Sequence, residues 1–84
     1  MATIIGRDIL MAKIRAALQY PVQREAIADW ATDALRTEHP VEDDDVVWHV
    51  LERLSGVDLR GSSGLYVDDD GVLREWLASL AGGE

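Results

Sequence analysis

The sequence predicts an all-α fold, a small four-helix domain with short loops and one Gly/Ser-rich loop before the last helix. Two observations predict it. Apolar residues recur at helical spacing in four segments, and prolines, glycines and acidic residues stand between those segments. The 84 residues leave room for a single domain, 1–84. We expect its helices at about 7–19, 22–37, 44–55 and 69–81.

Prolines bound the first two helices. Because a residue before proline is pushed out of the helical region, Tyr20 ends the first helix, and Pro21 suits the first turn of the second. Pro40 ends that second helix in the same way. The apolar stripe of the first helix contains Ile9, Leu10, Ile14, Ala17 and Leu18, and that of the second contains Ile27, Trp30, Ala31, Ala34 and Leu35.

The third and fourth helices share one arrangement, in which an acidic run is followed by an apolar stripe and then by glycine. Ser55–Gly56 predicts a left-handed stop for the third helix, and Gly82–Gly83 for the fourth. Gly61 to Gly64 predicts a flexible turn between them. The two stripes contain Val47, Val50, Leu51 and Leu54, and then Leu73, Trp76, Leu77 and Leu80, whereas Trp48 falls beside its stripe.

The charge is strongly acidic and uneven. The formal net charge is −8, and twelve of the sixteen acidic residues lie within 38–84. Such a balance argues against a broad basic face for nucleic acid and against anionic membranes, so we expect neither partner. The absence of cysteine excludes disulfides and thiolate metal sites. With no signal peptide and no long apolar run in the sequence, we expect a soluble, cytoplasmic protein.

The two acidic runs admit two interpretations. One Asp in each run can cap the following helix, and its neighbours favour the positive end of the helix dipole. The charge left over predicts a partner with a basic site, with Trp48 or Tyr66 as an aromatic anchor. The candidate partner-binding residues are Asp43, Asp44, Asp45, Trp48, Asp58, Tyr66, Asp68, Asp69 and Asp70.

Other kinds of site find little support. A calcium loop centred on Gly71 would need acidic ligands at Tyr66 and Leu77. His49 stands near Asp45 on one helix without a second histidine, which favours a surface helix over a metal site. A helix-turn-helix would present the acidic start of the third helix to phosphates. We therefore expect no enzyme, no metal and no cofactor.

The segments REAIADWA, VVWHVLERLSGVDLR and LYVDDDGVLREWLASL resemble a group of small acidic helical proteins of actinobacteria. In length, acidity and an Asp-rich stretch leading into a Trp-bearing last helix, the chain is also similar to the immunity proteins of nuclease bacteriocins. That family binds its toxin through two adjacent tyrosines. Tyr66 stands alone, so no toxin-binding residue carries over.

These observations lead to one functional hypothesis and one alternative. The hypothesis is an acidic protein-binding module of immunity or antitoxin type that neutralises a basic partner. The alternative is a structural or regulatory adaptor, with a homodimer as one form, in which the acidic runs serve only as helix caps.

Overall fold

A computed structural model describes residues 4–82, which form four α-helices. They are α1 (Arg7–Gln19), α2 (Arg24–Arg36), α3 (Asp45–Leu54) and α4 (Asp70–Leu80), with a single 3-10 turn, η1 (Pro21–Gln23), leading into α2. The predicted all-α class is confirmed, and each helix begins and ends within two residues of its expected bounds. Within 4–82, no helix is long and apolar enough to cross a membrane.

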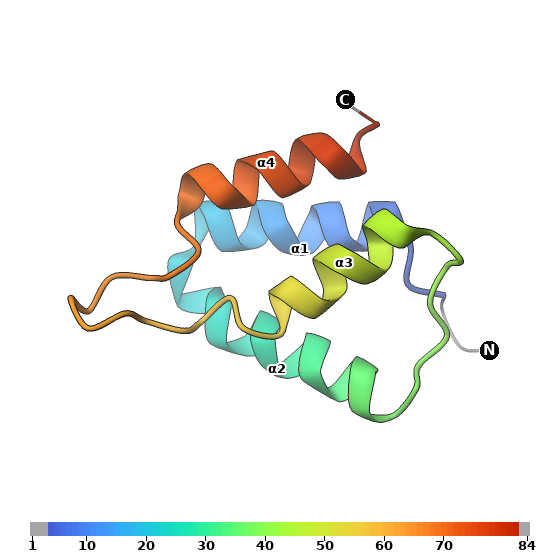
Figure 1. Cartoon of the computed structure of the whole chain (residues 1–84), viewed down its shortest axis with the longest axis horizontal. Helices are drawn as coiled ribbons and strands as arrows, with labels where there is room; N and C mark the ends of the chain where they lie inside the picture. The colour runs from blue at the N-terminus through green and yellow to red at the C-terminus, as the bar shows by residue number, and fades with distance from the viewer. Residues whose placement is uncertain (1–3, 83–84) are drawn as a thin grey trace.

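The helices pack in two main pairs, one between the first and last helices and one between the two consecutive middle helices. α1 contacts α4 most extensively, and α2 contacts α3 (Figure 1). The buried core between them consists mainly of aliphatic side chains: Ile5, Leu10, Ile14, Ala17, Ile27, Ala28, Ala31, Ala34, Val47, Val50, Leu51, Leu54, Val57, Leu73, Trp76 and Leu80. Trp30 is partly buried against this core, and Trp48 is 41% exposed. The apolar stripes therefore face inward, as the helical period predicts.

The end of α2 is a left-handed turn without glycine. Glu38 has a φ of 53°, and the N–H of His39 donates to the carbonyl of Ala34 at 3.0 Å. The N–H of Glu38 donates to the carbonyl of Leu35 at 3.4 Å. These two bonds form a Schellman motif, whose left-handed position usually holds glycine. The chain then turns toward Val41, which pairs with Ile5 in an isolated parallel bridge.

The third helix ends at Leu54, close to its expected bound, but the left-handed geometry predicted for its stop at Ser55–Gly56 is wrong. Ser55 keeps right-handed helical angles, and Gly56 has no positive φ. The N–H of Val57 donates to the carbonyl of Leu54 at 3.1 Å, so the chain continues in right-handed turns. The reason is burial, since these turns bring the fully buried Val57 into the core. At the end of α4, Gly82 has a φ of 84° as expected, and Gly83 lies outside the described residues.

Between α3 and α4 the chain projects from the helices as an arm, defined here as residues 59–67 (Figure 1). Arg60 and Tyr66 form an antiparallel bridge, and the N–H of Val67 donates to the carbonyl of Leu59 at 3.0 Å. Gly64 turns the tip with a φ of 83°. The arm is thus a short hairpin-like loop, closed by this one bridge, that extends away from the core.

Candidate functional site

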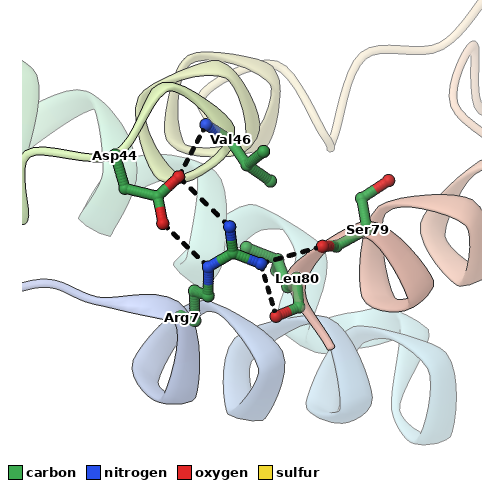
Figure 2. Close-up of polar contacts among 5 residues, drawn as sticks. All are labelled: Arg7, Asp44, Val46, Ser79 and Leu80. Carbon is green, nitrogen blue, oxygen red and sulfur yellow. Dashed lines mark hydrogen bonds and ion pairs between the residues drawn. The ribbon is translucent and has the colours of Figure 1, made fainter. Parts of the chain in front are cut away.

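Arg7 joins three helices at one end of the molecule. Its Nε donates to Asp44 Oδ2 at 2.8 Å, and its Nη2 donates to Asp44 Oδ1 at 3.3 Å (Figure 2). Its Nη1 donates to the carbonyls of Ser79 and Leu80, each at 3.0 Å. The last carbonyls of a helix lack partners inside it, and a cation there also complements the helix dipole. Arg7 therefore fixes the end of α4 against the starts of α1 and α3.

The carboxylate of Asp44 has two structural roles. Its Oδ1 accepts from the N–H of Val46 at 2.9 Å, which makes it the N-cap of α3. The hydrogen bond from the Arg7 guanidinium, more than the bond from the Val46 backbone, holds the pKa of Asp44 below its usual range. The same ion pair raises the pKa of Arg7. Asp44 is therefore already engaged within the chain.

A second arginine organises the opposite end of the molecule. Arg24 is 1% exposed, and its Nη1 donates to the carbonyls of Val57 at 3.1 Å and Asp68 at 2.7 Å. Its Nη2 pairs with Asp70 Oδ1 at 3.0 Å. The guanidinium also lies 4.1 Å from the centre of the Tyr66 ring. Arg24 thus connects the chain at both ends of the arm to α2.

Sequence reasoning missed Arg24, although a signal for it exists. Arg24 precedes Ile27 by three residues and Ala28 by four, so it falls on the apolar stripe of its own helix. A cation on such a stripe is buried only where carbonyls and a carboxylate meet it. Those partners lie 33 to 46 residues away, beyond the reach of a local pattern.

The structure separates the two acidic runs. Asp44 lies beside Ser79 and Leu80 through Arg7, whereas Asp69 caps the other end of α4 by accepting from the N–H of Val72 at 3.0 Å. With a rise of about 1.5 Å per residue, the length of α4 places the runs roughly 15 Å apart. One Asp in each run is a cap, as predicted. The runs do not form one continuous acidic face.

The remaining candidate residues are divided between these two ends. Asp43, Asp45 and Trp48 are exposed around the start of α3. Near the arm, Asp69 and Asp70 are exposed, while Asp58, Tyr66 and Asp68 are half-buried. Asp44 and Asp70 are paired with arginines, and Asp69 is a cap.

A groove between α3 and α4 contains His49. It has a volume of about 400 Å³ and is lined by Asp45, Val46, His49, Val50, Glu75, Trp76 and Ser79. Within residues 4–82, His49 forms no hydrogen bond with either of the two carboxylates in that lining, and no cluster of His, Asp and Glu has the geometry of a metal site. Neither carboxylate of this groove therefore orients His49 as a base.

The cations divide into two sets. Five have internal partners: Arg7 and Arg24 as above, Arg36 with Asp33 at 2.9 Å, Lys13 over the Trp30 ring at 4.7 Å, and Arg60 over the Tyr66 ring at 4.6 Å. The other three, Arg15, Arg53 and Arg74, are exposed and form no ion pair in the described part of the chain.

The two longest segments of the chain without an acidic residue carry exposed arginines. One runs from residue 9 to residue 24 and contains Arg15, and the other is the arm, which contains Arg60. The two segments meet at one end of the molecule. Arg24, the residue that follows α1 and η1, bonds to the carbonyls of Val57 and Asp68, which flank the arm. We call this surface, made of the second half of α1, η1 and the arm, the acid-poor end.

A family model described as "YxzC DNA-binding protein" matches residues 6–80. The chain is also similar to YxzC of Bacillus subtilis (strain 168), with 37% identity over 65 residues. That alignment covers 77% of this chain and 53% of the relative, so the chain spans about half the length of the curated protein it matches. No solved structure is significantly similar to it.

These findings overturn several predictions. The assigned resemblance to actinobacterial proteins and to bacteriocin immunity proteins is wrong, since the chain matches a different family. The inhibitor role, the basic protein partner and the exclusion of nucleic acid conflict with a family described as DNA-binding. The physical reason for the error is that a net charge averages over the chain, whereas recognition depends on the charge of one surface.

Proposed function

We propose, from the premise that this chain belongs to the YxzC DNA-binding protein family, that it is a small regulatory protein that binds duplex DNA. The observation that carries the proposal is the family match over residues 6–80, which includes all four helices. The adaptor alternative, in which acidic residues act as helix caps, agrees better with this role than an inhibitor does. The proposal assigns no catalytic activity and is compatible with the cytoplasmic location expected from the sequence.

Charge limits how DNA can approach. The start of α3 carries the acidic residues 42–45, which repel phosphates, so α3 is a poor recognition helix. The acid-poor end offers Arg15 on α1 and Arg60 on the arm. We therefore place the DNA contact at this end. With few cations in contact, the affinity should be modest and only a few counterions should be released.

Fluorescence anisotropy of a labelled duplex tests this function. We expect saturable binding of the chain, with a plot of log Kd against log salt rising with a slope of about 1 to 3 between roughly 50 and 200 mM salt. Arg15→Ala should weaken binding to all sequences and reduce that slope by about 1. Absence of binding at the lowest salt would contradict the proposal.

Arg36→Ala is the matched control. It removes the same charge from the far end of α2, about 18 Å along the helix from Arg24. It should change the affinity much less than Arg15→Ala does. Equal effects of the two variants would argue against a contact at the acid-poor end.

A further inference from the structure

We infer that the arm enters the minor groove of DNA, with Arg60 as the cation that reads the groove and Leu65 as an apolar wedge. The inference rests on the proposed function and names the element that makes the contact. Proteins that bind the minor groove use arginine in this way and often insert an apolar side chain between base steps.

Arg60 is held ready for such a contact. Its guanidinium lies 4.6 Å from the centre of the Tyr66 ring, and its Nη2 donates to Tyr66 Oη at 3.2 Å. Its Nη1 donates to the carbonyl of Gly64 at 3.3 Å, so the cation lies toward the tip of the arm. Because the stacked ring already restricts the side chain, binding would cost less rotamer entropy. The remaining N–H groups are available to base edges or phosphates.

The ring that Arg60 stacks on is itself in contact with a buried residue. Tyr66 contacts the buried Arg24 as well, and Arg24 bonds to the carbonyls of Val57 and Asp68, which flank the arm. A hairpin that was merely a loose connection would need no such anchor. The anchored arm instead extends with its tip along the length of the molecule (Figure 1).

The tip has the shape and polarity of a groove-binding element. Gly61, Ser62, Ser63 and Gly64 form a thin turn, which suits a groove about 6 Å wide. Leu65 follows directly and is 73% exposed. In water this exposure is unfavourable, whereas against unstacked bases the side chain would be buried.

The distance between the tip of the arm and the nearby acidic residues explains how a protein with a net negative charge can bind DNA through the arm. Asp58 and Asp68 stand at the two ends of the arm, and three residues separate each of them from the turn at the tip, a span of at most about 10 Å. That length is similar to the screening distance of about 8 Å at physiological salt. A·T-rich minor grooves are narrow and concentrate negative potential, so a single arginine gains most there.

Three duplexes of one length test the groove. They contain A·T, G·C or I·C pairs at the centre, and inosine removes the minor-groove amino group of guanine while it keeps the major-groove acceptors. We expect the chain to bind the I·C duplex as tightly as the A·T duplex, and the G·C duplex about tenfold more weakly. Equal affinity for G·C and I·C, both weaker than A·T, would assign the contact to the major groove and overturn the inference.

Variants of the arm test the residues. Arg60→Ala and Leu65→Ser should each weaken binding to the A·T duplex about tenfold or more and reduce the preference over G·C, while Arg36→Ala changes both by less than about twofold. A circular-dichroism melt confirms that each variant is folded. If Arg60→Ala and Arg36→Ala bind alike, the arm does not contact DNA.

The outcomes separate this inference from the proposed function. A wild-type chain without any DNA affinity contradicts both. DNA binding that survives the arm variants overturns the inference alone. If those variants instead dissociate a homodimer in sedimentation and leave DNA affinity unchanged, the arm is a protein contact and the inference is wrong.

Discussion

Arg7 and Asp44 lie 37 residues apart in sequence and meet at 2.8 Å, and through this pair the N-cap of α3 is tied to both α1 and the end of α4. Asp44 accepts from Arg7 through both carboxylate oxygens, and its Oδ1 also accepts from the N–H of Val46. One side chain therefore begins a helix and fixes its position against two others. The acidity at this end of the protein serves the fold.

Because of the Arg7–Asp44 pair, we expect part of the free energy of unfolding to depend on pH in the acid range. The pKa of Asp44 is depressed in the folded state, so its stabilising contribution is present above its unfolded pKa of about 3.9 and is lost as the pH falls through the folded value. Asp44→Asn keeps a good N-cap residue but cannot titrate. We expect this variant to be less stable than wild type at pH 7, with the difference shrinking as the pH falls through the depressed pKa of Asp44. Urea titrations across this range measure it, and parallel stability curves would contradict the assignment.

Arg24 predicts a link between the core and the arm. Arg24→Ala removes two hydrogen bonds to carbonyls and an ion pair at a buried position, so we expect a loss of about 3 kcal/mol in the free energy of unfolding. Amide exchange in the arm should also speed up in this variant. Arg36→Ala, at an exposed pair, should cost less than about 1 kcal/mol. Unchanged exchange in the arm would show that Arg24 does not anchor it.

The left-handed backbone conformation of Glu38 leads us to predict a stabilising substitution. Its φ of 53° is strained for a residue with a Cβ, and Glu38→Gly should raise the free energy of unfolding by about 0.5–1 kcal/mol. Glu38→Ala removes the same charge and keeps the strain, so it should give no comparable gain. Chemical denaturation of the three proteins compares them. A gain shared by the alanine variant would assign the effect to charge.

The two glycines of the arm should respond differently to alanine. Gly64 has a φ of 83°, so Gly64→Ala should strain the turn by about 1–2 kcal/mol. At Gly61 an added Cβ would only reach ordinary contact, 3.9 Å from the carbonyl oxygen of Leu65. Gly61→Ala should therefore be nearly neutral. Thermal melts of both variants and NMR shifts of the arm decide whether this turn geometry is correct.

Local signals explain how far the sequence could predict this protein. The four helices followed from the period of the apolar residues, and a cap within each acidic run followed from acidic residues placed directly before a stripe; the structure shows these caps to be Asp44 and Asp69. Ser55–Gly56 predicted a left-handed helix end that does not form, because the burial of Val57 outweighed the usual preference of glycine for that conformation. Local patterns could not find the partners of Arg7 and Arg24, since both arginines meet atoms more than 30 residues away.

The expectation of no nucleic-acid partner, which conflicts with the family match, rested on the charge of the whole chain. The whole-chain charge of −8 hides the fact that Asp44 and Asp70 are paired with arginines and that the acid-poor end contains Arg15 and Arg60. Only the fold brings residues 9–24 next to the arm. A charge total gives solubility and long-range repulsion, whereas binding is decided at a surface.

An NMR titration of the ¹⁵N-labelled chain with a short A·T-rich duplex tests the central claim most directly. We expect chemical-shift changes to concentrate in residues 59–67, with smaller changes around Arg15, and the amides of residues 42–45 at the start of α3 to stay unchanged. Shifts confined to the start of α3, or no shifts at low salt, would contradict DNA binding through the acid-poor end.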